Sequence, residues 1–491
     1  MLVVEQRVTV HDSGIDLQPD HSRVVTQFFV PGREVVGPGD SRAGPVIDRI
    51  LQLDEEAVAQ AVDELTKRFA ERHRDLHHLF LEHADIVTPR VDTSAPLSNA
   101  RRLLIGAMFT HEYSIEGASI CNPSAVMAPT QPSDGGVNFV LSVRGIGEGH
   151  RSTIGFRTGH LDNDGRITVD TPGPYPVLPS LTTARHHLEA FRGRLTELGD
   201  NPDNSAFILD ALPSHFDDTQ LSARIHQLVN DPTRANVDAT TANLRLIADC
   251  SYRVTFPVAS ELSERVLWPR SSVERVGMED ARFVRFVDER GDVTYYATYT
   301  AFDGAQVRQQ LIETSDFITF SMSPLTGAAA SNKGMALFPR LINGRYAALS
   351  RADRESNWIS FSDDVHCWQD PVKIQAPQSS WEIVQIGNCG SPIETDQGWL
   401  VVTHGAGAMR TYSIGFILLD LNKPERLIAH GESPVITSWP NHTAGYVPNV
   451  VYSCGGFAHG DTLVLPYAFG DQCVTIATMS ITEILASLRR V

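Results

Sequence analysis

The sequence predicts an all-β core, built as a five-bladed β-propeller, with an N-terminal helical region and a helical insertion. Three observations predict this fold class. Short strand-like runs separated by Gly, Asp and Pro fill most of the chain after residue 117. Five of these segments resemble one another. Apolar residues recur near the 3.6-residue helical period in two stretches, 54–83 and 181–248. We therefore expect an N-terminal region at 1–117, a propeller at 118–480 with its insertion at about 181–248, and a C-terminal helix at 481–491.

The five similar segments each begin with an apolar or Pro-containing patch and continue through a Gly-bounded turn into a strand. They start near Asn122, Glu279, Ala336, Gly390 and Asn449, at spacings of 157, 57, 54 and 59 residues. Removing the insertion and its flanking loops brings the first interval nearer the others. A period of about 40–50 residues or slightly more is typical of propeller blades, each a four-stranded sheet. A β-sandwich with irregular strands is the alternative, and the similar length of four of the units favours the propeller.

The helical stretches carry amphipathic patterns. In 54–83, the acidic start at Asp54, Glu55 and Glu56 is typical of a capped helix N-terminus. A second helical stretch covers about 97–113, and ITEILASLRR at 481–490 is helical again. Within 181–248, the runs LTTARHHLEAFRGRLTELG and TQLSARIHQLVND are both amphipathic.

Composition and charge exclude several classes of protein. With 42% hydrophobic residues in 491, the chain can form a sizeable core, which argues against global disorder. The net charge of −18 argues against nucleic acid or an anionic membrane as a partner, since both require cationic faces. The N-terminus lacks the charge and apolar pattern of a signal peptide, and no apolar run approaches the ~18 residues of a membrane span. Six cysteines without CxxC spacing suit a reduced, cytoplasmic protein.

A propeller gathers loops around one end of a central channel, so each repeat is expected to supply a residue to one site. At the second repeat, VGMEDARF places Glu279 and Asp280 beside Arg282. Adjacent strand residues point to opposite faces, so only one carboxylate faces the channel squarely. That carboxyl is a candidate general acid. The alternative is a turn aspartate paired with Arg282.

Cationic and imidazole side chains recur in the later repeats. Lys333 and Arg351 stand at the two ends of a hairpin-like unit, and two cations converging on a channel indicate an oxyanion or phosphate site. Solvated surface cations are the alternative. His404 ends an apolar strand before Gly, which suits either a site lining or a structural histidine. Asp471 occupies the corresponding loop of the last repeat and, taken alone, is an ordinary turn aspartate.

Metal and cofactor motifs do not emerge. His73 and His77 form an i, i+4 pair beside His78 without an HExxH pattern, so a solvated helix face is the better interpretation than zinc. GIGEGH lacks the strand–helix context of a dinucleotide loop, and Gly-X-Ser-X-Gly is absent. We expect no metal and no organic cofactor.

Several motifs in order resemble glycoside hydrolase family 130, a family of β-mannoside phosphorylases with some β-mannosidases. They are NPSAV, SVRG, GMEDARFV, KGMALFPRLINGRYAALSR, SFSDDVHCW, GSPIETDQGWLVVTHG, LLDL and YAFGD. The resemblance covers about residues 118–480, leaves out the helical insertion, and implies a five-bladed propeller.

The resemblance also implies residue roles. Asp280 matches the catalytic acid, which acts through the 3-hydroxyl of the bound mannose, and Ala281 replaces the usual Pro beside it. The implied phosphate-binding residues are Lys333, Arg351 and His404, and the expected substrate-binding residues are Asn122, Arg144, Glu279, Tyr412 and Asp471. Asp471 would hold the mannose at the cleaved end, and Tyr412 would complete the phosphate set. One departure is Gln385, which stands where the family has a phosphate-binding Lys; Arg410 is a candidate replacement.

An inverting phosphorylase needs one acid and a cationic cradle for phosphate, whereas an inverting hydrolase needs a second carboxylate to activate water. We therefore expect inorganic phosphate as co-substrate and a β-mannoside oligosaccharide as substrate. One alternative is a β-mannosidase, with Glu279, Glu382 or Glu394 as base; another is a non-catalytic carbohydrate-binding propeller. The helical N-terminal region and insertion are expected to shape the acceptor side or a homo-oligomer interface.

Overall fold

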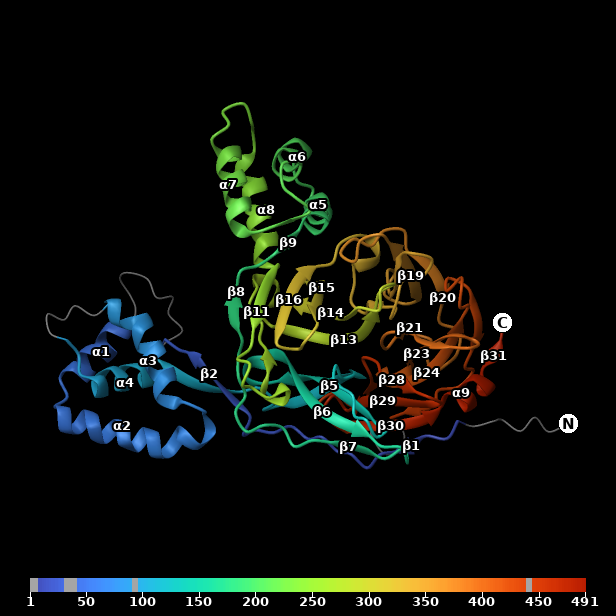
Figure 1. Ribbon diagram of the computed structural model, residues 1–491, viewed down its shortest axis with the longest axis horizontal. Helices are drawn as coiled ribbons and strands as arrows, with labels where there is room; N and C mark the ends of the chain where they lie inside the picture. The colour runs from blue at the N-terminus through green and yellow to red at the C-terminus, as the bar shows by residue number, and fades with distance from the viewer. Residues whose placement is uncertain (1–7, 31–41, 91–95, 439–443) are drawn as a thin grey trace. The chain divides into compact units, whose positions relative to one another are not determined.

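The computed structural model describes residues 8–30, 42–90, 96–438 and 444–491. The chain divides into two compact units (Figure 1). The larger unit is Met1–Pro19, Ala118–Pro172 and Leu178–Val491, and the smaller unit is Asp20–Gly117 with Gly173–Val177. In the part of the chain that the structure describes, no helix has the length and apolar character needed to cross a membrane.

The smaller unit packs helices beside a two-stranded sheet. Its helices are α1 (Ala43–Leu51), α2 (Glu55–Phe69), α3 (Leu76–Val87) and α4 (Asn99–Met108), and its strands are β2 (Val24–Phe28) and β3 (Thr110–Ser114). The predicted helical stretch 54–83 is two helices because a second N-cap, Asp75, accepts a hydrogen bond from the His78 amide at 3.0 Å and starts α3. The stretch predicted at 97–113 leaves the helix after Met108, since 110–114 pairs with β2 instead.

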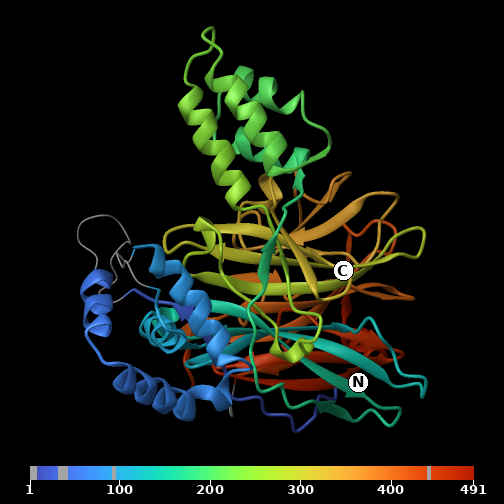
Figure 2. The ribbon, with the colours of Figure 1, turned by 60° about the vertical axis from the view of Figure 1, so that its left-hand side comes forward.

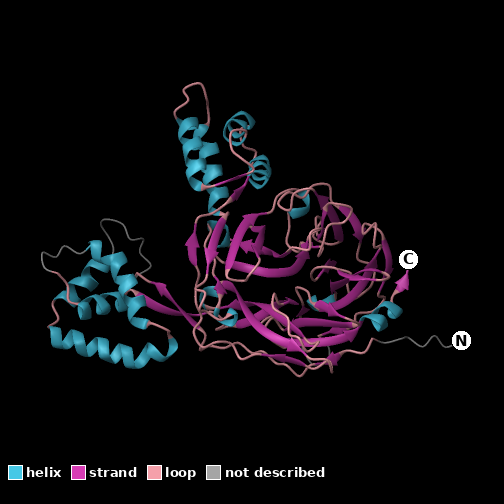
Figure 3. Cartoon of the chain, in the orientation of Figure 1, coloured by secondary structure: helices cyan, strands magenta, loops and turns pink. Residues whose placement is uncertain are grey.

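Strands fill the larger unit (Figure 3). The first sheet has eleven strands: β4 (Ser119–Met127), β5 (Val137–Ile146), β6 (Ser152–Leu161), β7 (Ile167–Val169), β8 (Ser180–Thr182), β11 (Tyr252–Thr255), β12 (Val266–Leu267), β13 (Gly277–Val287), β14 (Val293–Phe302), β15 (Val307–Thr314) and β16 (Thr319–Pro324). The next has four: β17 (Ala336–Leu337), β18 (Tyr346–Ser350), β19 (Asn357–Ser362) and β20 (Val372–Gln375).

Two further sheets complete the unit. One has seven strands: β21 (Gln385–Asn388), β22 (Ile393–Thr395), β23 (Gly398–Ala406), β24 (Tyr412–Leu419), β25 (Leu427–His430), β26 (Ile436–Thr437) and β31 (Arg489–Arg490). The last has five: β1 (His11–Asp12), β27 (Val451–Tyr452), β28 (Phe457–His459), β29 (Thr462–Phe469) and β30 (Cys473–Ser480). The helix α9 (Ile481–Ser487) follows β30 directly.

The first two repeats share one sheet through a single parallel pair, Gly277 with Ser152. A side chain at Gly277 would place its Cβ 2.1 Å from the Ser152 hydroxyl, so glycine is required for this approach. The β4–β7 strands and the β13–β16 strands therefore form one hydrogen-bonded sheet rather than two separate ones.

Apolar contacts link the groups of strands in chain order. Phe286 and Leu337 share a buried cluster between the β13–β16 strands and the four-stranded sheet, and Phe338 with Trp399 does the same for the next pair. The seven- and five-stranded sheets share a further cluster. The five-stranded sheet also packs on β4–β6, where Cys454 donates its amide to the Pro123 carbonyl at 2.8 Å. The last sheet thus returns to the first.

A helical insertion lies between β8 and β11. It contains β9 (His186–His187), β10 (His215–Phe216), α5 (Leu188–Glu197), α6 (Pro202–Leu209), α7 (Asp218–Val229) and α8 (Val237–Asp249), and its four helices gather together (Figure 2). The helices share their own apolar core, which includes Phe191, Phe216 and Leu244. The insertion therefore has a core distinct from those between the sheets.

Histidines join the insertion to the sheet unit. The His187 ring lies 4.0 Å from the His366 ring and 4.7 Å from the His215 ring, measured between centroids. Burial, with His366 and His215 nearby, lowers the pKa of His187 to about 3; Arg185 acts in the same direction and Asp364 opposes it. The imidazole is therefore neutral in the folded protein at neutral pH.

We predict that the insertion loosens as the pH falls from about 6.5 toward 3. Between these two values, His187 takes up a proton in the unfolded state but not in the folded state. The unfolded state therefore binds more protons, and the free energy of unfolding decreases as the pH decreases. Hydrogen exchange of α5–α8 measures this opening. His187→Asn should flatten the pH dependence, whereas His226→Asn on exposed α7 should keep it. Equal pH dependence in the wild type and His187→Asn would contradict the prediction.

Candidate functional site

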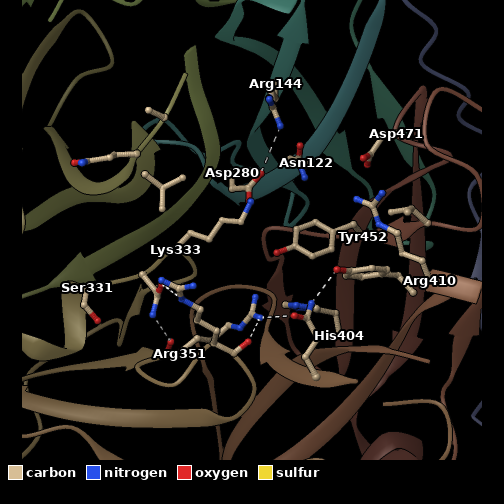
Figure 4. Close-up of a pocket in the computed structure, with 18 residues that line it drawn as sticks. Asn122, Arg144, Asp280, Ser331, Lys333, Arg351, His404, Arg410, Tyr452 and Asp471 are labelled. Atoms are coloured by element: carbon tan, nitrogen blue, oxygen red, sulfur yellow. Dashed lines mark hydrogen bonds and ion pairs between the residues drawn. The ribbon is translucent and has the colours of Figure 1, made fainter. Parts of the chain in front are cut away.

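One cavity of about 780 Å³ in the larger unit collects most of the predicted site residues (Figure 4). Eight of the nine line it: Asn122, Arg144, Asp280, Lys333, Arg351, His404, Tyr412 and Asp471. The ninth, Glu279, does not line the cavity and instead accepts a hydrogen bond from Arg144 Nη2 at 2.6 Å. Residues from all five repeat regions thus converge on one cavity.

Irregular backbone presents three of these side chains. Asn122, Asp280 and Asp471 have positive φ angles of 47°, 54° and 46°. Asn122 and Asp280 each lie at a register shift, in β4 between Cys121 and Ser124 and in β13 between Glu279 and Arg282. A bulge re-aims a strand residue, and positive φ in non-glycine residues is concentrated at functional sites. The backbone distortion therefore directs these polar side chains into the cavity.

Hydrogen bonds from β4 position Asp471, which lies in the turn between β29 and β30. The Ser119 hydroxyl donates to the Asp471 carbonyl, and the Ile120 amide donates to the Gln472 carbonyl at 3.3 Å. The contact between the last and first sheets thus also fixes a cavity residue.

The Asp280 carboxyl is 7% exposed and lies among cations. Burial acts to raise its pKa, but Lys333, Arg144, Arg282 and Arg351 together hold the pKa of Asp280 below its usual value. Figure 4 shows Lys333 extending toward Asp280. Arg144 Nη1 is 4.0 Å from Asp280 Oδ1. The surrounding protein groups therefore favour the ionised carboxylate.

Arg282 binds residues next to the cavity without lining it. Its Nε donates to the Cys389 carbonyl at 2.7 Å and its Nη2 donates to the Tyr452 hydroxyl at 2.8 Å. Among the described contacts it has no ion pair with Asp280, so the alternative of a simple turn aspartate paired with Arg282 does not describe this site.

Arg351 is a buried cation whose hydrogen-bond partners are neutral. Its Nη2 donates to the Arg354 carbonyl at 2.6 Å and to Gln385 Oε1 at 2.8 Å, while its Nε has no partner in the described structure. Burial lowers the pKa of Arg351, although a guanidinium stays charged in proteins. Gly387 permits the packing, since a Cβ there would be 2.7 Å from Arg351 Cδ. A buried cation without a carboxylate partner is suited to binding an anion.

His404 is fully buried in β23 next to this cation. Burial, with Arg351 and Arg282 nearby, keeps the pKa of His404 well below its usual value, so its ring is neutral. Its Nε2 has no partner in the described structure. The ring packs against both Tyr412 and Tyr452, at centroid distances of 6.0 and 4.7 Å. A neutral imidazole that carries its proton on Nε2 can donate one hydrogen bond to a ligand.

Asp471 differs from Asp280 in its charge state. Burial, with the Asp280 carboxylate nearby, raises the pKa of Asp471 to about 6, against the opposing effects of Arg144, Arg410 and Lys333. The two carboxyls therefore have separated pKa values, an arrangement that commonly separates the roles of acids in a site.

Gln385 has a structural role that its sequence position did not reveal. Its Oε1 accepts from Arg351 and its Nε2 donates to the Tyr412 hydroxyl at 2.8 Å. The amide thus links a cation to a tyrosine at the cavity wall. Arg410, the candidate replacement, also lines the cavity but is exposed.

Tyr452, Arg354 and Gln306 also line the cavity and were not predicted. Tyr452 follows the start of the fifth repeat by three residues, so the repeat contained a signal for it. Arg354 and Gln306 lie in turns without such a signal. Within the described residues, no group of three or more His, Cys, Asp or Glu is placed to hold a metal ion.

Comparison with known proteins adds the family relationship. A family model described as beta-1,4-mannooligosaccharide phosphorylase, the model of glycoside hydrolase family 130, matches residues 237–490. A 1,2-beta-oligomannan phosphorylase of Thermoanaerobacter sp. is 33% identical over 230 residues, covering 45% of this chain and 75% of that protein. A beta-1,2-mannobiose phosphorylase of Listeria innocua is 31% identical over 229 residues, covering 45% of this chain and 63% of that protein.

Among solved structures, the Listeria innocua beta-1,2-mannobiose phosphorylase in complex with beta-1,2-mannobiose is similar to this chain at 19% identity. The TM-score is 0.45, with 76% of this chain and 92% of that chain covered. Asn122, Arg144 and helices α5–α7 lie outside the residues that the family model matches.

We predict that inorganic phosphate binds this cavity and raises the melting temperature by a few degrees at concentrations well above its dissociation constant. Lys333→Gln should weaken phosphate binding about tenfold, because it removes a cation that faces the anion. Lys423→Gln, the same change in an exposed turn, should have no effect. Thermal unfolding over a phosphate titration measures the binding. Equal shifts in both variants would contradict the assignment of the cavity.

Proposed function

Because the chain belongs to glycoside hydrolase family 130, we propose that it is an inverting β-mannoside phosphorylase, which cleaves β-mannosidic bonds with inorganic phosphate or forms them from α-mannose 1-phosphate. The observation that carries this proposal is a single low-pKa carboxyl, Asp280, facing a cavity whose cations Lys333 and Arg351 have no carboxylate partner among the described ion pairs. The names of the relatives, which are all mannoside phosphorylases, support the same reaction class.

We also infer that the strands of the larger unit form five propeller blades within a catalytic domain at 118–480. The blades would be β4–β7, β13–β16, β17–β20, β21–β25 and β27–β30. The apolar clusters that link them in chain order, and the return of the last sheet to the first, support this arrangement. A central channel would then explain why the cavity residues come from positions so far apart in the sequence.

In the proposed reaction, Asn122, Arg144 and Asp471 hold the terminal mannose, with Glu279 orienting Arg144 through its 2.6 Å hydrogen bond. Lys333, Arg351 and the Nε2 proton of His404 hold phosphate, and Tyr412 closes the cavity beside Gln385. A phosphate oxygen forms a bond to the anomeric carbon while the bond from that carbon to the glycosidic oxygen breaks. The Asp280 proton reaches the departing oxygen through the 3-hydroxyl of the mannose. Inversion gives α-mannose 1-phosphate.

The negative charge of bound phosphate would change the protonation state of Asp280. The cations of the protein alone favour the ionised carboxylate, which cannot donate a proton. A bound phosphate dianion offsets Lys333 and Arg351 and adds negative charge, so the pKa of Asp280 rises when the co-substrate is present. The acid is thus protonated in the complex that needs it.

The carboxylates considered as a hydrolytic base have other partners. Glu279 is bonded to Arg144, Glu394 forms an ion pair with Arg340 at 2.6 Å, and Glu382 accepts backbone amides of Gln378 and Ser379 at 3.1 and 3.2 Å. None of the three lines the cavity. Phosphate, which is already a nucleophile, requires no such base.

The decisive experiment measures product release from β-linked mannobioses and mannotrioses with and without phosphate. We expect turnover only with phosphate, and α-mannose 1-phosphate as the product. Free mannose released at equal rates under both conditions would establish a β-mannosidase instead. Binding of the mannosides without turnover under either condition would establish a carbohydrate-binding protein.

We predict that Asp280→Asn lowers kcat by about 10²–10⁴-fold, because an amide cannot supply the proton. The matched control is Asp288→Asn, which lies in the turn at the other end of β13, where an amide oxygen can still accept the Arg290 amide. Its kcat should stay within about twofold of the wild type. Steady-state kinetics at saturating phosphate provide the measurement, and near-normal turnover in Asp280→Asn would assign the acid elsewhere.

Asp471 predicts an acid limb in the pH profile. With its pKa raised to about 6, this carboxyl becomes protonated below that pH and loses the charge that accepts sugar hydroxyls. We expect kcat/KM for the mannoside to fall as the pH falls below about 6. Asp471→Asn should have a low kcat/KM that no longer shows this limb. An unchanged limb in the variant would assign the titration to another group.

A further inference from the structure

A second cavity, of about 740 Å³, adjoins the first. Gln306, Val307 and Ser331 line both. The other walls come from α5 of the insertion, from the start of β15, from Gly327, Ala328 and Ala330, and from Cys367 and Gln369. The two cavities therefore share a boundary, and one of the walls of the second lies outside the residues that the family model matches.

Close packing fixes the α5 wall against the sheets. A Cβ on Gly193 would lie 2.3 Å from the Thr326 hydroxyl, so glycine allows the helix to approach this far. Glu197 accepts the Gly327 amide with one carboxylate oxygen and binds Arg194 with the other, each at 2.5 Å. The α5 wall is thus held against the sheets by the close approach of Gly193 to Thr326 and by the hydrogen bond from the Gly327 amide to Glu197.

The charges of the second cavity are unequal. Its carboxylates are already paired, Glu197 with Arg194 and Glu189 with Arg192 at 3.5 Å. Arg308 has instead a neutral partner among its described contacts, since its Nη2 donates to Gln306 Oε1 at 2.9 Å. At the edge of the first cavity, Arg354 likewise donates to Asn332 Oδ1 at 3.0 Å. Among the residues that the structure describes, those lining the second cavity include no aromatic platform for a neutral sugar ring.

Arg194 and Arg308 both line this cavity. Burial lowers the pKa of Arg308, and the nearby Arg194 acts in the same direction, against the opposing effects of Cys250, Asp303 and Glu197. Two arginines held near each other without a carboxylate for one of them are stabilised by an anionic ligand. A leaving group that extends from the first cavity past Gln306 would bring its far end to this position.

We propose that the second cavity binds the leaving-group, or acceptor, end of the substrate and that Arg308 selects an acceptor carrying a negative charge there. This inference rests on the proposed phosphorylase function and adds the acceptor class to it. The start of β15 and the α5 wall of the insertion would then together determine which acceptors the enzyme uses.

The test compares acceptors in synthesis from α-mannose 1-phosphate. Mannobionic acid carries a carboxylate at its former reducing end, mannose 6-phosphate carries a phosphate, and mannobiose and mannose are their neutral counterparts. We expect kcat/KM to be about tenfold or more higher for at least one acid than for its neutral counterpart. The arm that shows the preference identifies carboxylate or phosphate as the preferred group.

Arg308→Gln should remove the preference and leave the neutral acceptors within about twofold, whereas Arg308→Lys should retain part of it. Arg245→Gln, an exposed change on α8 that lines neither cavity, is the control and should behave as the wild type. Equal use of acidic and neutral acceptors, or a preference that persists in Arg308→Gln, would overturn the proposal while leaving phosphorolysis intact.

If phosphate-dependent turnover is absent, the proposed function fails, and calorimetric binding tests the cavity independently. Mannobionic acid would be titrated in saturating phosphate, so that the first anion site is occupied. Binding that is weakened about tenfold in Arg308→Gln supports the inference, and equal binding in both proteins overturns it.

Discussion

The site depends on one electrostatic arrangement: a buried carboxyl, Asp280, surrounded by Lys333, Arg144, Arg282 and Arg351. Burial alone would raise the pKa of this carboxyl, and the cations reverse that shift. Three of these cations, Lys333, Arg144 and Arg351, also line the cavity in which we propose that phosphate binds. Under this proposal, phosphate binding and the protonation of Asp280 are linked, because both respond to the same positive charges. The proton donor would then be protonated when its nucleophile is bound.

The fold is needed to assemble this arrangement. The cations and the carboxyl come from different groups of strands, and the apolar clusters between those groups fix their relative positions. The contact between the last sheet and the first also positions Asp471, through the Ser119 hydroxyl. Bulges and positive φ angles at Asn122 and Asp280 are conformations that a strand adopts only when its neighbours hold it there. The packing of the sheets thus holds the side chains of the site in position.

Six of the nine candidate residues were recognised in the repeat segments, and the family resemblance matched these and supplied the other three, Asn122, Arg144 and Tyr412. Eight of the nine line one cavity. The sequence could not show that Glu279 turns to Arg144, since strict alternation along a strand does not account for the bulge after it. Nor could it show that Gln385 links Arg351 to Tyr412, because that depends on three strands meeting. The sequence did not reveal the cavity at Arg308, because Arg308 in β15 and Arg194 in α5 are 114 residues apart and share no sequence pattern.

The linkage between phosphate and Asp280 can be measured directly. The ¹³C chemical shift of the Asp280 carboxyl, in protein labelled at aspartate and assigned with Asp280→Asn, reports its protonation as the pH is varied. The account predicts a pKa below the ordinary aspartate value without phosphate and a pKa at least one unit higher when phosphate saturates the site. A pKa that is the same in both titrations would contradict the coupling of proton donor and nucleophile.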